Sequence, residues 1–183
     1  AGVSALAQAV AFERPEWLSP AALNGALPAA GRAWAGADVP ADFHATHDAK
    51  ERVYVYVLSA RGIDEERVAA AASRLAGEHD YHNLTLDESG TVRTIDVDVD
   101  AEGDVLLVTV TAGGFPRQLV RRLVTLLRSI GAGAAPLAKI DRVLAPEPLE
   151  GPDGVSPAPA TPLCLANVTY DVTFDVDPDA LED

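Results

Sequence analysis

The stretch TVRTIDVDVDAEGDVLLVTVT, residues 91–111, decides the fold, because it consists of two alternating runs joined by a turn. Apolar residues recur at every second position in both runs, which is the period of a β-strand with one buried face. The residues between the runs, Ala101–Asp104, include a glycine and acids and predict a tight turn. We therefore expect an antiparallel hairpin at the centre of a sheet.

The segments on either side of this hairpin predict the rest of the sheet and its helices. ERVYVYVLS, residues 51–59, is apolar on both faces and predicts a central strand. Asp64 and Gly77 are the expected start and stop signals of a helix over 65–76. Further strands are expected over 6–12, 33–39 and 163–176, helices after Ser19, up to Gly131 and over 137–144, and a long loop over 145–162.

This order of elements favours an α+β fold, an antiparallel sheet with helices packed on one side. A doubly wound nucleotide-binding fold is not favoured, and the sequence contains no Gly-rich phosphate loop. The trio Glu78–Asp80 resembles an acid–base group, but it follows a helix stop and is expected to be a cap or turn.

The composition indicates a soluble protein of a reducing cytoplasm. The formal net charge is −14, yet lysine occurs only at Lys50 and Lys139, a balance suited to solubility at high salt. No apolar run is long enough to span a membrane and no signal-peptide pattern is present. Cys164 is the single cysteine and has no metal-ligand spacing around it.

One window of this acidic chain, residues 105–140, contains no Asp or Glu. On a helix at 100° per residue, Arg117, Arg121 and Arg128 would fall within about 40°, and Arg122 would lie on another flank. One interpretation is a solvated helix face. The other is a face that binds phosphate, because guanidinium groups form forked bonds to it and a merely solvated helix carries both signs.

Four pieces, in this order, resemble the TruA type of tRNA pseudouridine synthase. They are FHATHDAKERVYVYV (43–57), LAGEHDYHNL with RTID (75–84 and 93–96), AGGFPRQLVRRLVTLLRSIGAG (112–133) and SPAPATPLCLANVTY (156–170). The resemblance implies the pseudouridine synthase fold, isomerisation of uridine in tRNA with an anticodon-arm uridine as the default, no cofactor or metal, and a homodimer.

The resemblance also implies roles for particular residues. Tyr54 would be the catalytic aromatic residue and Arg121 the catalytic cation, while Leu163 and Phe115 would line the substrate pocket. Without the resemblance, Tyr54 and Leu163 would be interpreted as ordinary core residues. Residues expected to contact the RNA are Lys50, Arg52, Arg117, Arg122, Arg128 and His44. His44 and His47 also lie near Asp48, but they lack a further ligand with metal spacing and are interpreted as loop residues.

The opening AGVSALAQAVAFE is similar to the segment directly after the family's Gly-Arg-Thr-Asp motif, whose aspartate is the nucleophile. We therefore expect the nucleophile to precede Ala1, residues 1–41 to be a remnant of the N-terminal catalytic subdomain, and residues 42–183 to form the C-terminal subdomain. As given, the chain would then be inactive. Two alternatives remain: a non-catalytic RNA-binding module of the same fold, and a ferredoxin-like regulatory or dimerisation domain.

Overall fold

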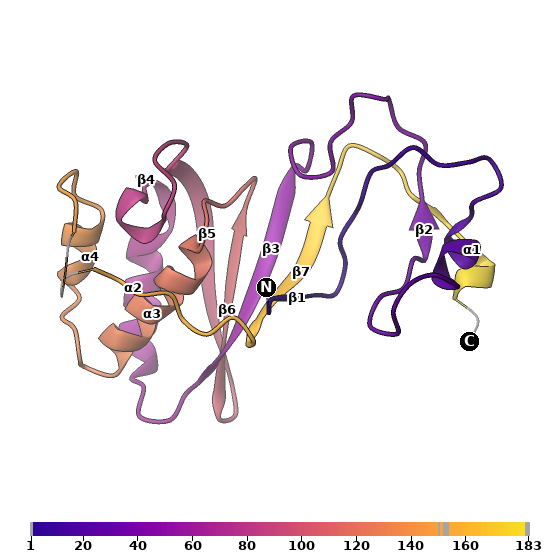
Figure 1. Cartoon of the computed structure of the whole chain (residues 1–183). Coiled ribbons are helices and arrows are strands. Elements are labelled where there is room, and N and C mark those ends of the chain that lie inside the picture. Colours follow the sequence, from indigo (N-terminus) through magenta and orange to yellow (C-terminus); the bar gives the residue numbers. More distant parts are fainter. Residues whose placement is uncertain (1, 150, 152–153, 182–183) are drawn as a thin grey trace. The chain divides into compact units, whose positions relative to one another are not determined.

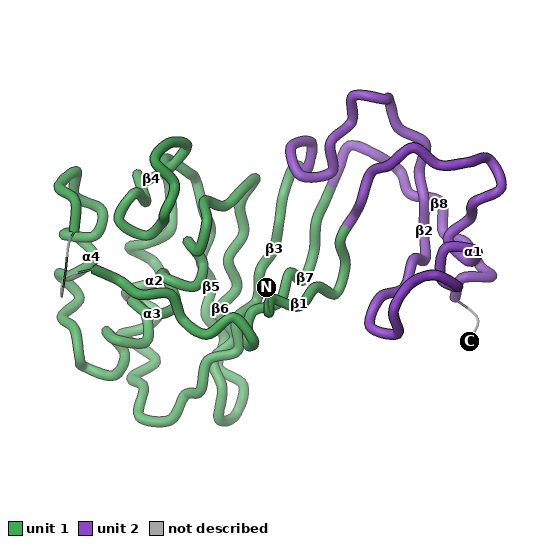
Figure 2. The backbone as a smooth tube through the Cα atoms, viewed as in Figure 1, with its two compact units in different colours: residues 1–8, 50–169 green, residues 9–49, 170–183 purple. Residues whose placement is uncertain are grey.

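The computed structural model describes residues 2–149, 151 and 154–181, and its chain forms two compact units. Unit 1 comprises residues 1–8 and 50–169, and unit 2 comprises residues 9–49 and 170–183 (Figure 2). In the described part of the chain, no helix has the length and apolar character needed to cross a membrane.

Unit 1 is built on a six-stranded sheet with the order β1-β7-β3-β6-β5-β4 (Figure 1). All neighbouring strands are antiparallel except β1 and β7, which are parallel. The predicted central strand 51–59 is confirmed, since β3 lies between β7 and β6. The strands are β1 (Ser4–Ala5), β3 (Glu51–Ser59), β4 (Gly77–Asp80), β5 (Val92–Glu102), β6 (Val105–Ala112) and β7 (Leu163–Thr169).

The hairpin of β5 and β6 follows the alternation of its sequence. Glu102 pairs with Val105, so the turn is only the two residues Gly103 and Asp104, and Gly103 has a φ of 60°. Glycine accepts this left-handed conformation without a steric penalty. Every second residue of β6 is buried on the helix side, beginning with Leu106, while Thr109 and the others between them face away.

Two helices cover one face of the sheet, α2 (Glu65–Leu75) and α3 (Leu119–Gly131) (Figure 1). The predicted cap is confirmed, because the Asp64 carboxylate accepts a hydrogen bond from the backbone N–H of Arg67 at 3.1 Å. The helices meet closely where α3 ends: Asp64 N–H donates to Gly131 O at 2.9 Å. Shorter elements complete the unit, namely η1 (His82–Leu84) and α4 (Lys139–Val143).

The predicted α+β class, with an antiparallel sheet and helices on one side, is confirmed. The helices at 65–75 and 139–143 lie within the predicted ranges. The predicted turn at Glu78–Asp80 is wrong: these residues form the edge strand β4, antiparallel to β5. Their sequence has no alternation of its own, and pairing with the neighbouring strand determines their conformation.

Unit 2 holds the short elements α1 (Pro20–Asn24), β2 (Ala35–Gly36), β8 (Asp175–Val176) and η3 (Pro178–Ala180). The Ser19 hydroxyl caps α1 as predicted, accepting from Ala22 N–H at 3.2 Å. Strands β2 and β8 pair antiparallel, and the Asp177 carboxylate accepts from Ala21 N–H at 3.0 Å. Contacts between the two ends of the chain therefore build this unit.

One predicted strand does not form, and two others differ from the expected length. The segment 6–12 is not a strand: β1 ends at Ala5, and 33–39 contains only β2. The closing strand 163–176 is divided, because β7 pairs with β3 only as far as Thr169 and β8 pairs with β2. Alternating apolar residues indicate an extended chain, but a strand also needs a partner along its whole length.

The grouping into two units describes contacts within the chain. The division at residues 41 and 42 rests on the family resemblance, and it stays a prediction.

Candidate functional site

Two tyrosines of β3 point toward the helix-covered side of the sheet. The ring of Tyr54 is half-buried and meets Phe115 edge-on, with ring centroids 5.2 Å apart and planes at 81°. Burial raises the pKa of the Tyr54 phenol, and the neighbouring Arg52 guanidinium offsets part of that rise. Tyr54 is therefore a neutral and partly exposed aromatic ring, and such a ring suits stacking against a base.

Phe115 belongs to a short connection, residues 113–118, that leads from β6 into α3. The Arg52 guanidinium donates to Gly113 O at 2.7 Å, which ties the start of this connection to β3. A Cβ at Gly113 would lie 3.3 Å from Lys50 O, so glycine permits the close approach of the two backbones. Of the residues predicted to contact RNA, Arg52 is therefore on β3, the strand that carries Tyr54, and Lys50 directly precedes that strand.

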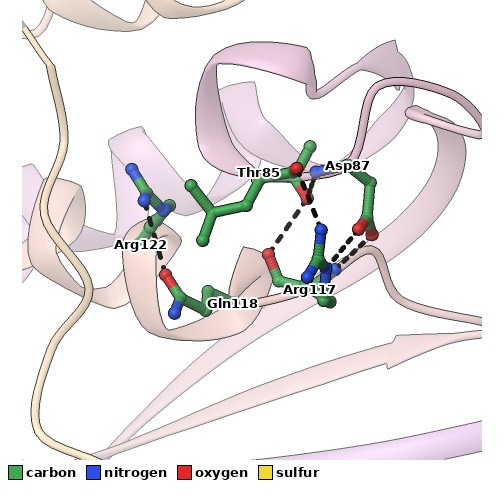
Figure 3. A network of polar contacts seen from close by, with 6 residues as sticks. Thr85, Asp87, Arg117, Gln118 and Arg122 are labelled. Atoms are coloured by element: carbon green, nitrogen blue, oxygen red, sulfur yellow. Dashed lines mark hydrogen bonds and ion pairs between the residues drawn. The ribbon is translucent and has the colours of Figure 1, made fainter.

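Arg117 lies outside the helix, since α3 begins at Leu119. The expected wedge of three arginines on one helical face is therefore wrong for Arg117, although Arg121 and Arg128 are both on α3. Gln118, the residue before the helix, has a φ of 65° and interrupts the helical path. Figure 3 shows the Arg117 side chain turned toward Asp87, with its Nε 2.5 Å from Asp87 Oδ1.

Arg121 and Arg122 both bind the loop that precedes β7, through its residues Val155 and Ala158. Arg121 Nε donates to Ala158 O at 2.6 Å, and Ala158 N–H donates back to Arg121 O at 3.0 Å. Arg122 Nη1 donates to Val155 O at 2.5 Å. Within the described residues, the terminal nitrogens of Arg121 have no hydrogen bond, whereas Arg122 Nε is buried without a partner. These two arginines hold the loop against α3.

Arg128 is exposed, and its guanidinium has no hydrogen bond or ion pair within the described part of the chain. Burial raises the pKa of the Tyr56 phenol, and the charges of Arg121 and Arg128 offset part of the rise. Both arginines belong to α3, one of the two helices that cover the sheet. The positive potential there can attract an anion.

Leu163 starts β7, is buried, and pairs with Tyr56 across the β3–β7 ladder. Tyr54 pairs with Leu165 in the same ladder. Tyr54 within β3, Leu163 at the start of β7 and Phe115 in the connection before α3 thus lie on neighbouring elements of unit 1. The roles of these three residues in catalysis and in the substrate pocket stay predictions.

His44 belongs to unit 2. Its Nδ1 accepts from Thr46 N–H at 3.1 Å, and its ring lies 4.2 Å from that of His47. In the described residues, no three His, Cys, Asp or Glu side chains gather as a metal site would require. His44 as an RNA contact stays a prediction.

Sequence reasoning missed two contributors to this part of unit 1. Tyr56 shares the face of Tyr54, as the alternation of residues 51–59 indicates, but the sequence did not lead to a site role for it. Asp87 follows η1 and reaches Arg117 across 30 residues, and no local pattern predicts that ion pair. An open hollow elsewhere in the unit is lined by Asp64, Glu66, Arg67, Ala70, Ile130 and Leu137, none of them a predicted site residue.

Unit 1 is an antiparallel sheet with helices on one side, which is the fold that the motifs indicated. The family model described as tRNA pseudouridine synthase matches residues 71–171. Similar proteins include the tRNA pseudouridine synthase A of Haloarcula marismortui, 56% identical over all of this chain and 70% of that protein. The protein of the same name from Natronomonas pharaonis is 52% identical over all of this chain and 69% of its own length.

A third relative, the tRNA pseudouridine synthase A of Methanosarcina mazei, is 38% identical over 93% of this chain and 64% of that protein. The chain belongs to the tRNA pseudouridine synthase family, of the TruA type that its motifs resemble. Haloarcula and Natronomonas are halophilic archaea, in agreement with the acidic composition.

Proposed function

We propose that this chain isomerises uridine to pseudouridine in tRNA, with an anticodon-arm uridine as the default substrate. The observation that carries the proposal is the half-exposed Tyr54 ring, packed edge-on against Phe115 in a chain of this family. In the reaction the N1–C1′ bond breaks and the base turns. C5 then joins C1′ and loses its proton, while N1 gains a proton. The uridine must leave the helical stack for this, so the enzyme needs a surface that receives a flipped base.

The candidate residues divide this work. The Tyr54 ring would stack on the base, with Phe115 and Leu163 as the apolar walls. Arg121 would supply the cation near the reacting centre, since its terminal nitrogens remain available within the described residues. The reaction would need no cofactor or metal. Lys50, Arg52, Arg122, Arg128 and His44 remain the candidate contacts to the RNA backbone, which is held largely through its shape and phosphates.

We further propose that the protein works as a homodimer in the cytoplasm, where its tRNA substrate is found. The two family subdomains would be residues 1–41 and 42–183. The homodimer is testable by sedimentation at the high salt that the composition suits. A molar mass near 19.1 kDa would indicate a monomer instead.

The decisive experiment combines tRNA binding with release of tritium from tRNA labelled at uridine C5. Tritium release together with binding supports the isomerase. Binding without release would favour the second candidate, a non-catalytic RNA-binding module. That candidate has the same fold and binds tRNA without carrying out chemistry on it. If the chain neither binds tRNA nor releases tritium, both candidates are refuted.

The same assay tests the site through Arg121→Glu, with Arg61→Glu as the matched control. Both substitutions reverse one charge, but Arg61 lies on an exposed turn of unit 1 outside the candidate site. We expect Arg121→Glu to abolish tRNA binding at fixed salt and Arg61→Glu to have a much smaller effect. Equal losses would mean that net charge, and not the site, determines the binding.

A further inference from the structure

The connection between β6 and α3, residues 113–118, is attached to the rest of unit 1 at three points. Arg52 holds its first carbonyl, at Gly113. Phe115 in the middle packs on Tyr54. Arg117 near its end is bound by Asp87, which lies 30 residues earlier in the chain. The position of the Phe115 ring is thus determined by contacts on both of its sides.

The contact between Arg117 and Asp87 uses both carboxylate oxygens (Figure 3). Arg117 N–H donates to Asp87 Oδ2 at 2.7 Å, and the side-chain Nε lies 2.5 Å from Oδ1. The backbone hydrogen bond from Arg117, followed by that from its side chain, lowers the pKa of Asp87. Asp87 is therefore charged at neutral pH, and its two oxygens hold both the main chain and the side chain of Arg117.

Thr85 ties the same two residues together from the other side. Its hydroxyl donates to Arg117 O at 3.0 Å and accepts from Asp87 N–H at 3.0 Å. Thr85 is 8% exposed, so these bonds are shielded from water. Arg117 is thus held by hydrogen bonds at its N–H, its carbonyl and its guanidinium. A side chain whose role is to contact an RNA phosphate would not need these three attachments to the protein.

The residue after Arg117 shows why such an attachment is needed. Gln118 is the one non-glycine residue with a positive φ in the described part of the chain, at 65°. This conformation is unfavourable for a residue with a Cβ and persists only where the surroundings hold it. Releasing Arg117 would let residues 116–118 relax and would change both the start of α3 and the position of Phe115.

We propose that Asp87 and Arg117 are positioning residues that hold Phe115 against Tyr54, so that Arg117 acts on the protein and not on the RNA backbone. This inference rests on the proposed function, since it holds that tRNA binding requires a fixed conformation of residues 113–118. It gives Arg117 a different role from the phosphate contact that the sequence suggested. The two roles predict opposite results for substitutions at Asp87.

The sign of the Asp87→Ala effect separates the roles. If Arg117 contacts phosphate and Asp87 is merely a nearby acid, removing the acid reduces repulsion and strengthens binding. If the pair positions Phe115, the same substitution weakens binding. Glu88→Ala is the matched control, because it removes the same charge one residue away and Glu88 is exposed, with no hydrogen bond or ion pair in the described residues.

The experiment measures tRNA dissociation constants at several salt concentrations for Asp87→Ala, Arg117→Ala and Glu88→Ala. We expect the first two substitutions to weaken tRNA binding by about tenfold. This is the loss that results when Phe115 is packed against Tyr54 in only about a tenth of the free molecules. The slope of log affinity against log salt should stay that of the wild type. Loss of a phosphate contact would instead reduce the slope by roughly 0.7–0.9. A reduced slope for Arg117→Ala, or binding by Asp87→Ala as tight as wild type, overturns the proposal.

A second readout does not depend on RNA. The Phe115 ring current shifts the Tyr54 ring signals in NMR spectra, and we expect this shift to disappear in Asp87→Ala and to persist in Glu88→Ala. A persisting shift in folded Asp87→Ala overturns the positioning role. If wild-type protein binds no tRNA, the proposed function fails, and the ring shift still decides whether the pair positions Phe115. Should Asp87→Ala fail to fold, Asp87→Asn, which keeps an acceptor for Arg117 N–H, takes its place in both measurements.

Discussion

Replacing Gly131 with alanine adds one methyl group where α3 ends beside α2. The new Cβ would lie 2.5 Å from Val68 Cγ2 and 2.8 Å from Ile63 Cγ2, far inside the ~3.5–4.0 Å at which carbon atoms attract. Val68 is fully buried and branched, so it has no free volume to move into. Overpacking costs about 1–3 kcal/mol, and the better helix propensity of alanine returns roughly 0.5–1 kcal/mol. From the middle of both ranges, we expect Gly131→Ala to lower the free energy of unfolding by roughly 1 kcal/mol.

Equilibrium denaturation at high salt measures this change, and the midpoint temperature should fall by about 2–4 °C for each kcal/mol in a chain of this size. Gly31→Ala is the control, because its Cβ would meet nothing closer than Pro28 O at 3.8 Å, so its stability should stay within about 0.5 kcal/mol. Val68→Ala should cost less in the Gly131→Ala background than in wild type, since the two methyl groups compete for one space. An unchanged or higher stability of Gly131→Ala would refute the reasoning.

Three further predictions concern a buried hydroxyl, an acid and a candidate site residue. The Tyr81 hydroxyl donates to Leu75 O at 2.7 Å inside the core, so Tyr81→Phe should cost about 0.5–1.5 kcal/mol in denaturation experiments, and no loss would contradict the bond. A hydrogen bond from the Thr91 side chain lowers the pKa of the Asp80 carboxyl below its usual value of 3.8. The charged carboxylate therefore stabilises the fold above pH 3.8, and this stabilisation is lost as the pH falls through the lower pKa of the folded state. Asp80→Asn should therefore destabilise the protein at pH 6 and match wild type in strong acid, and a constant difference across a pH series of melting curves would argue against this. Arg121→Lys keeps the charge but loses the forked guanidinium, and tRNA affinity should fall by roughly tenfold in a binding assay, whereas wild-type affinity would mean that only charge matters.

The sheet could be predicted where the sequence alternates and its partners are local. The hairpin of residues 91–111 is such a case, because the two strands are joined by a short turn that sets their register. The closing segment 163–176 alternates equally well, but its pairing changes from β3 to β2 after Thr169. Periodicity describes which side chains share a face. It does not identify the strand on the other side of the ladder.

The candidate site was predictable as a set of motifs and not as a geometry. The family resemblance indicated Tyr54 and Phe115 separately, and the structure shows that their rings are in contact. A helical projection placed Arg117 with Arg121 and Arg128, but the projection assumes a helix that the left-handed Gln118 interrupts. The partner of Arg117 could not be predicted either, because only the folded chain brings Asp87 to it.

The chain passes between its two units at residues 8–9, 49–50 and 169–170, and this has a consequence for folding during synthesis. Ala35 of β2 finds its partner, Val176 of β8, only after the whole of unit 1 has been translated. At ~5–20 residues per second the first half of unit 2 waits on the order of ten seconds. During that time Ala35 and Gly36 lack the strand partners that β8 supplies. The large sheet is able to form before the small unit, and a ribosome stalled shortly before residue 170 would carry a chain whose unit 2 cannot close.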